Sequence, residues 1–160
     1  MYIGFGSIPI PDKVKFLRTL EGVLAKKRVV LGVGWSILDG LPVHPDLFVV
    51  KYVNHAWLLP RCSVTVIHGG IGTVGAALRS GTPLIVVSIL ADQPINGKMI
   101  EQKKLGRHIP FKDLSPERLL DAINATKDPV ITENCKAAAA TVTAEDGLEK
   151  AVHLIEQYFQ

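Results

Sequence analysis

The feature that most constrains the fold is a β-branched run in mid-chain that ends in a glycine turn. Residues 64–67 read Val-Thr-Val-Ile, residues 68–70 read His-Gly-Gly, and helical composition begins near Thr73. A strand, a glycine turn and a helix N-terminus in this order leave unpaired backbone N–H groups at the positive end of the helix dipole. Such a turn favours phosphate binding. A second apolar run over residues 84–90 leads to Asp-Gln at 92–93, which we expect at the same edge of a parallel sheet.

Apolar runs alternate with amphipathic stretches along the rest of the chain. Further strands are expected over residues 2–5, 28–33, 47–53 and 107–110. Helices are expected from Asp12 to about residue 24, over 94–104, from Ser115, and over 129–141 and 144–158. Strand and helix alternate at the spacing of βαβ units. The sequence therefore predicts an α/β fold, a Rossmann-like parallel sheet with helices on both faces.

Composition excludes several classes of protein. The 160 residues are 48% hydrophobic, which is enough for one domain with a core of its own. The net charge is +3 with scattered Lys and Arg and only 6% aromatic residues, so no nucleic-acid partner is expected. Cys62 and Cys135 form neither a disulfide framework nor a zinc motif, which favours a reducing, cytoplasmic compartment and no metal. No apolar run approaches the ~20 residues of a membrane span.

Five segments carry a resemblance to a known family. They are residues 2–7 (Tyr-Ile-Gly-Phe-Gly-Ser), 34–36 (Gly-Trp-Ser), 53–60 (Val-Asn-His-Ala-Trp-Leu-Leu-Pro), 68–73 (His-Gly-Gly-Ile-Gly-Thr) and 92–93 (Asp-Gln). In this order they resemble the donor-binding half of two-domain, GT-B type UDP-glycosyltransferases, and most closely the sterol glucosyltransferases of fungi and bacteria. The resemblance implies that residues 1–160 are one UDP-sugar donor-binding domain, one half of a GT-B fold, and that the N-terminal acceptor domain is absent.

The resemblance also implies a set of donor-binding residues. They are Ser7, Trp35, Val53, His68, Gly70, Gly72, Thr73, Asp92 and Gln93. In this scheme Trp35 stacks on the uracil ring and the backbone at Val53 bonds its edge. The turn that follows His68 contacts the diphosphate together with Ser7, and the pair 92–93 binds sugar hydroxyls. Plant enzymes hold the ribose with a Glu where this chain has Ala76, so the ribose contact stays unassigned.

The implied reaction is an inverting transfer, in which an acceptor hydroxyl attacks the anomeric carbon and expels UDP. The N-terminus of the helix after the glycine turn and the side chain of His68 stabilise the charge on the departing phosphate, without a metal or another cofactor. The base is a histidine of the N-terminal domain, so no catalytic residue is expected in this chain. The expected partners are a UDP-sugar, an acceptor domain or subunit, and a lipid-like or sterol-like acceptor that implies peripheral contact with a membrane. The expected sugar is glucose.

Two other functions fit parts of the sequence. Residues 70–75 form a literal G-x-G-x-x-G, and with Asp92 they are typical of an NAD(P)-binding oxidoreductase, although that fingerprint normally belongs to the first βαβ unit. A non-catalytic donor subunit of a split transferase is the other alternative. Asp92 is also a candidate helix N-cap. In the 53–60 segment we expect Trp57 and Leu58 to pack inward and His55 to make a structural bond.

Overall fold

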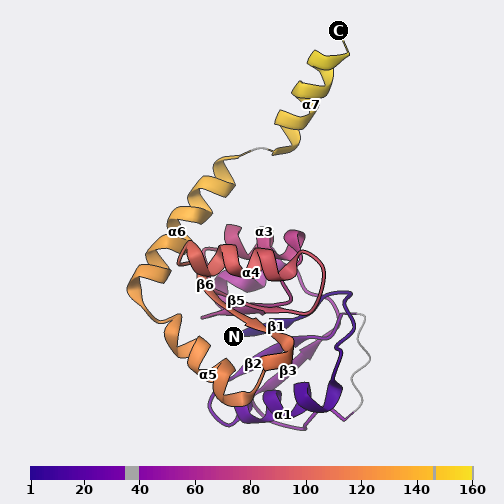
Figure 1. Cartoon of the computed structure of the whole chain (residues 1–160), viewed down its shortest axis with the longest axis vertical. Helices are drawn as coiled ribbons and strands as arrows, with labels where there is room; N and C mark the ends of the chain where they lie inside the picture. The colour runs from indigo at the N-terminus through magenta and orange to yellow at the C-terminus, as the bar shows by residue number, and fades with distance from the viewer. Residues whose placement is uncertain (35–39, 146, 160) are drawn as a thin grey trace.

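A computed structural model describes residues 1–34, 40–145 and 147–159. Six parallel strands form one sheet in the order β3-β2-β1-β4-β5-β6 (Figure 1). The strands are β1 (Tyr2–Gly4), β2 (Val29–Gly32), β3 (Leu47–Val50), β4 (Thr65–Ile67), β5 (Leu84–Ser88) and β6 (Gly106–Pro110). The direction of winding reverses between β1 and β4, which is where open α/β sheets bind their ligands. The predicted Rossmann-like sheet is confirmed.

Helices cover both faces of the sheet. They are α1 (Lys13–Leu24), α2 (His55–Leu58), η1 (Leu59–Arg61), α3 (Ile71–Arg79), α4 (Gln93–Gln102), η2 (Phe111–Asp113), α5 (Pro116–Ala125), α6 (Pro129–Ala144) and α7 (Gly147–Tyr158). In Figure 1, α1 and α5 lie below the sheet, while α3, α4 and α6 lie above it. The helices of the predicted βαβ units are therefore present, and they form the outer two layers of a three-layer domain.

Two hydrophobic cores explain why the strands read as unbroken apolar runs. In β5, Ile85 and Val87 point into the core under α1 and α5, whereas Leu84 and Val86 point into the core under α3, α4 and α6. All four side chains are buried. A strand covered on both faces needs apolar residues at consecutive positions. This double burial holds the strand ends, and therefore the loops that follow them, in fixed positions.

Helix starts follow the capping residues that the sequence displays. Asp12 accepts a hydrogen bond from the N–H of Lys15 at 2.9 Å, and Ser115 accepts one from the N–H of Arg118 at 3.2 Å. Both predicted starts are confirmed. β3 is shorter than predicted, because residues 51–53 leave the sheet and line a cavity beyond its edge.

The prediction that Trp57 packs inward is wrong. Its side chain is 57% exposed, and the guanidinium carbon of Arg61 lies 4.6 Å from the centre of its ring. Leu58 and Leu59 are buried, as predicted for Leu58. Helix α2 is a single turn and offers only one face to the core, so the two leucines occupy it and the tryptophan stacks on arginine outside.

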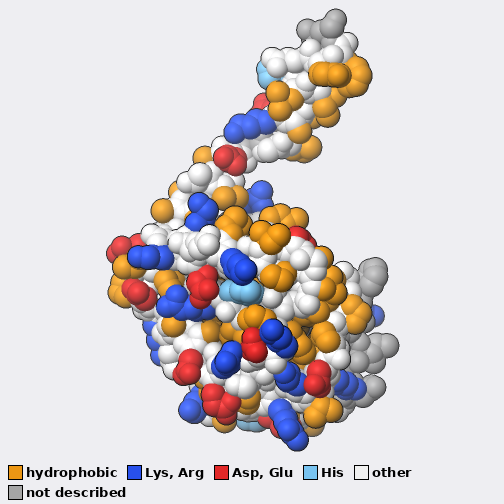
Figure 2. Space-filling view, in the orientation of Figure 1, with side chains coloured by type: hydrophobic (Ala, Val, Ile, Leu, Met, Phe, Trp, Pro, Cys, Tyr) orange, Lys and Arg blue, Asp and Glu red, His pale blue; other side chains and the backbone are white. Residues whose placement is uncertain are grey.

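Helix α7 extends away from the rest of the domain in Figure 1. None of its described residues is buried, and hydrophobic side chains gather along one side of it in Figure 2. The exposed side chains of Leu148, Val152 and Ile155 recur along α7 at helical spacing. Among the described residues, no helix has the length and apolar character needed to cross a membrane.

Candidate functional site

A cavity of about 240 Å³ opens beyond the carboxyl ends of β1, β2 and β3. It is lined by Tyr2, Gly6, Ser7, Gly32, Gly34, Lys51, Tyr52, Val53 and His55. Gly34 has φ +54, and a Cβ there would lie 2.1 Å from the carbonyl oxygen of Gly6. Only glycine allows the loops after β1 and β2 to approach this closely. Of the predicted site residues, the structure places Ser7 and Val53 in this cavity, while Trp35 lies outside the described residues.

Tyr2 and His55 form one wall of this cavity. The Tyr2 hydroxyl hydrogen-bonds His55 Nε2 at 3.1 Å, and the two rings meet edge to face with centroids 5.4 Å apart. A Cβ on Gly4 or Gly32 would lie 2.3 or 2.5 Å from the same hydroxyl oxygen, so the two strand glycines make room for the tyrosine ring. Burial lowers the pKa of His55, which favours the neutral imidazole. The predicted structural bond of His55 is confirmed.

The glycine turn joins the end of β4 to the start of α3. Gly69 has φ +95, and a Cβ on it would lie 2.6 Å from Val86 Cγ1. Gly70 occupies the N-cap position of α3 without a side-chain cap, and nothing lies within 4 Å of a Cβ built on Gly72. Among the described residues, the N–H groups of residues 71 and 72 donate to no acceptor, whereas the N–H of Thr73 bonds the Gly70 carbonyl. The helix therefore presents free donors to an open approach, as the sequence predicts.

His68 is buried beside this turn. Its side chain is 7% exposed, and its Nδ1 makes no hydrogen bond within the described part of the chain. The ring lies between two glycines: a Cβ on Gly70 would be 2.4 Å from Nε2, and a Cβ on Gly6 would be 3.3 Å from Cε1. Burial lowers the pKa of His68, and the carboxylate of Asp92 opposes this by raising it. An unpaired buried nitrogen costs about 1–3 kcal/mol, which an anionic ligand would recover.

The loop between β5 and α4 contributes the predicted pair Asp92 and Gln93. Asp92 occupies the N-cap position of α4, as its alternative role predicts, but its side chain makes no capping bond to the backbone. Its Oδ2 instead accepts a hydrogen bond from Asn96 Nδ2 at 2.9 Å. Gln93 is 3% exposed, and its Oε1 accepts the N–H groups of Ile89 and Leu90 at 2.8 and 3.1 Å. The Gln93 oxygen therefore organises the loop. Its role toward a sugar stays a prediction.

Asn96 is a site residue that sequence reasoning missed. Its Nδ2 donates to the carbonyl oxygen of Gly69 at 2.9 Å as well as to Asp92. One amide group therefore ties the glycine turn to the loop before α4. The available signal was an Asn four residues after Asp92, since residues four apart lie on one face of a helix.

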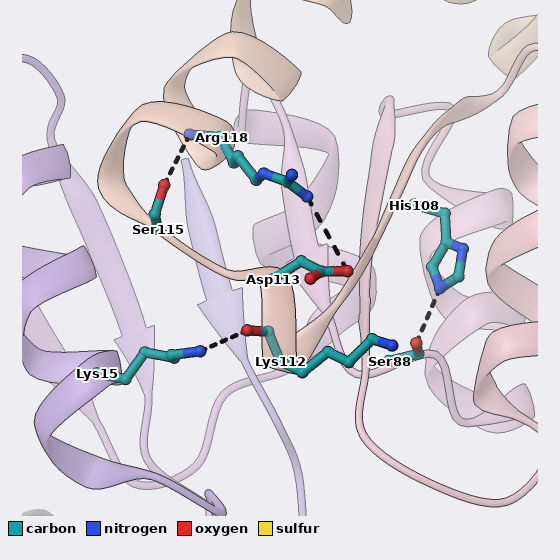
Figure 3. A network of polar contacts seen from close by, with 7 residues as sticks. All are labelled: Lys15, Ser88, His108, Lys112, Asp113, Ser115 and Arg118. Atoms are coloured by element: carbon teal, nitrogen blue, oxygen red, sulfur yellow. Dashed lines mark hydrogen bonds and ion pairs between the residues drawn. The ribbon is translucent and has the colours of Figure 1, made fainter.

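Further polar contacts lie in and after β5 and β6 (Figure 3). Ser88 Oγ lies 2.8 Å from His108 Nε2, and Lys15 Nζ donates to the carbonyl oxygen of Lys112. The first pair has the spacing of a nucleophile and its base, but burial lowers the pKa of His108, and no described residue bonds its Nδ1. These contacts tie β5 to β6 and α1 to the segment after β6.

Comparison with known proteins decides the family. Residues 27–156 match the family described as erythromycin biosynthesis protein CIII-like, C-terminal domain. The chain belongs to this family. The G-x-G-x-x-G of residues 70–75 follows β4 and begins α3. It does not belong to the first βαβ unit of the chain, where the fingerprint of NAD(P)-binding domains normally lies.

Several proteins similar to this chain are named as sterol 3-beta-glucosyltransferases. A sterol 3-beta-glucosyltransferase of Arabidopsis thaliana is 34% identical over 156 residues, which are 95% of this chain and 24% of the relative. One of Cryptococcus neoformans is 30% identical over 172 residues, 97% of this chain and 11% of the relative. The chain thus spans a quarter or less of the length of these relatives. The predicted resemblance is confirmed.

Solved structures agree with the family at the level of the fold. The glycotransferase of kitacinnamycin superposes with a TM-score of 0.81 at 27% identity, over 98% of this chain and 42% of that chain. The glycosyltransferase VinC, solved in complex with dTDP, superposes with a TM-score of 0.78 at 21% identity, over 98% of this chain and 40% of that one. The domain therefore has the fold of one half of a two-domain glycosyltransferase.

Proposed function

We propose that the chain is the donor-binding domain of an inverting, UDP-sugar-dependent glycosyltransferase that transfers glucose to a sterol-like hydroxyl. Its family and the names of its relatives support the transferase class, the sugar and the acceptor. The observation that carries the proposal is the buried His68, whose Nδ1 bonds no described residue, beside the N-terminus of α3, which has no side-chain cap. Together these groups suit an anion that is dehydrated on binding.

The geometry suits an extended ligand. The cavity beyond β1–β3 is the proposed binding site of the uridine. Gly6 lines this cavity, and a Cβ on it would lie 3.3 Å from Cε1 of His68, so the cavity adjoins the histidine. Asp92 lies close enough to His68 for its charge to act on the imidazole. We therefore propose adjoining subsites for nucleoside, diphosphate and sugar, in that order along the sheet edge.

The proposed chemistry is stabilisation of the leaving group. Cleavage of the bond to the sugar leaves negative charge on a phosphate oxygen, and free N–H groups at the start of α3 with the His68 ring stabilise it. This role requires no metal or other cofactor. We assign the general base and the lipid-like acceptor to an N-terminal acceptor domain or subunit, in a cytoplasmic protein with peripheral membrane contact.

Calorimetric titration with UDP, UDP-glucose and uridine tests the proposal. His68→Ala should weaken UDP binding about 10- to 100-fold, the effect of losing a bond of about 1.5–3 kcal/mol to a charged group, and should leave uridine binding nearly unchanged. His108→Ala is the matched control, since it removes a half-buried histidine bonded to Ser88 away from the turn. UDP that does not bind at millimolar concentration, or equal weakening of UDP and uridine, would refute the proposal.

The nucleotide is tested separately. VinC was solved with dTDP, so competition between UDP and dTDP for this chain is the direct comparison. We expect UDP to bind more tightly. A preference for dTDP would keep the transferase class and replace the proposed donor by a deoxythymidine diphosphate sugar.

A further inference from the structure

The opposite edge of the sheet carries a larger cavity. It has a volume of about 850 Å³ and lies among the residues that precede β1, β2, β4 and β5. Four cationic side chains line it, Lys27 and Arg28 before β2, Lys127 before α6 and Lys136 within α6. We name this cavity the amino-edge groove. Its volume is in the range of ligand sites, and it shares no lining residue with the cavity beyond β1–β3.

The amino-edge groove gathers four of the 18 Lys and Arg side chains of the protein. Its lining contains no Asp or Glu, and within the described residues none of its four cations is in an ion pair. The chain has a net charge of +3, so the remainder of the chain carries 3 − 4 = −1. The groove is therefore a positive site on a protein that is otherwise slightly acidic, and it attracts anions.

Hydrogen-bonding groups accompany the charges. Ser63 is exposed and Thr132 is half-buried in the groove lining, and their hydroxyls bond no described residue. The hydroxyls of Ser80 and Thr126 are instead bonded to backbone carbonyls of their own helices. Phosphate oxygens accept from both ammonium and hydroxyl donors, so the free groups match a phosphate.

Neutralisation of helix ends does not account for the whole cluster. α1, α3 and α5 end at this edge, and cations there interact favourably with their C-terminal carbonyls. This explains Lys27, Arg28 and Lys127. Lys136, however, lies near the middle of α6, far from either end of that helix, and lines the same groove.

We propose that the amino-edge groove binds a multiply charged ligand that carries phosphate groups. The ligand is either a soluble phosphate ester or the headgroup of a phosphorylated lipid, since both present the same oxygens. The proposal is independent of the donor site, because the two cavities lie at opposite edges of the sheet.

Two probes distinguish the sources. Inositol hexakisphosphate represents the soluble ester, and phosphatidylcholine vesicles with and without phosphatidylinositol bisphosphate represent the lipid. The paired substitution Lys127→Glu with Lys136→Glu should weaken binding of the active probe at least about tenfold, because two charge-assisted contacts become repulsions. Lys103→Glu with Lys150→Glu makes the same change in net charge at exposed positions outside the groove, and should change binding less than about twofold.

The outcomes decide the proposal. Binding of either probe that depends on the groove pair supports it and identifies the source. No binding at about 0.15 M salt, equal loss in the control pair, or displacement of the probe by UDP would overturn it. A loss of thermal stability in the groove pair with unchanged binding would also overturn it, because the cations would then serve only the helix ends.

Discussion

The two edges of this sheet favour anions by different physical means. At the carboxyl edge the donors are backbone N–H groups and a buried imidazole, held by Gly69 and Gly70 in one geometry. At the amino edge the donors are ammonium and guanidinium groups on long side chains. A rigid site selects a ligand by shape, whereas flexible charges select it by charge. We therefore expect the proposed site at the carboxyl edge to be the more specific of the two and the amino-edge groove to be the more permissive.

The largest expected effect is that of Gly69→Ala, which should disrupt the proposed site at the carboxyl edge and leave the amino-edge groove intact. Gly69→Ala places a Cβ at φ +95 and 2.6 Å from Val86. We expect the free energy of unfolding to fall by about 2–3 kcal/mol and UDP binding to be lost, while the amino-edge groove keeps its ligand. Urea denaturation and calorimetry measure both.

For stability, Gly72→Ala is the matched glycine control, because open space surrounds a Cβ at that position. It should raise the stability by roughly 0.5–1 kcal/mol. Wild-type stability and UDP binding in Gly69→Ala would contradict the claim that this turn is rigid.

Salt sharpens the comparison. Raising the salt concentration from about 0.05 to 0.2 M should lower the affinity of the amino-edge groove for its ligand about tenfold, because the contacts there are made by exposed charges. UDP at the carboxyl edge should weaken less than about threefold, since its contacts are to buried dipoles. Titrations of both ligands across this range provide the test, and equal salt dependence would remove the distinction between the edges.

Asn96→Ala probes the tie within the carboxyl edge. Loss of its bonds to Gly69 and Asp92 should weaken UDP-glucose binding about fivefold, which corresponds to about 1 kcal/mol, and UDP binding less. Asn124→Ala, on the exposed face of α5, is the control. A uniform loss of stability with no difference between UDP-glucose and UDP would show that Asn96 only supports the fold.

The smallest effect concerns pH. Burial lowers the pKa of His55, His68 and His108, so the unfolded chain binds more protons than the folded one just below the ordinary histidine pKa. The contribution of the neutral histidines to the free energy of unfolding is therefore fully present at neutral pH. It is lost as the pH falls through about 6.5 toward the lowered pKa values of the folded chain. Melting temperatures from about pH 7.5 to 5.5 should decline less in His68→Gln than in the wild type. An equal decline would show that His68 does not contribute.

The parts of the fold that sequence predicted are those fixed by local chemistry. β5 reads as a strand because both its faces are buried, α1 starts where Asp12 caps it, and the turn after β4 needs glycine at positive φ. Each of these signals lies within a few residues. The donor-binding roles assigned by resemblance stay predictions, although the structure brings Ser7, Val53 and the turn to one edge.

The parts that sequence missed depend on contacts between distant residues. Tyr2 meets His55, and Asn96 reaches Gly69, across separations that no periodicity reveals. The cations of the amino-edge groove look scattered along the chain, and only the packing of α6 against the α3 side of the sheet brings Lys136 near Arg28. Trp57 was misplaced because composition does not indicate which side of a one-turn helix faces the core.

The central position of β1 has a consequence for the order of folding. Tyr2 pairs with Val30 on one side and with Thr65 on the other, so the middle of the sheet closes only when segments far apart in the chain have met. Bringing such distant segments together costs chain entropy before the stabilising contacts between them form, and this cost slows folding. Both proposed anion sites lie across this strand pairing. They should therefore become competent together, late in folding, as a single cooperative event.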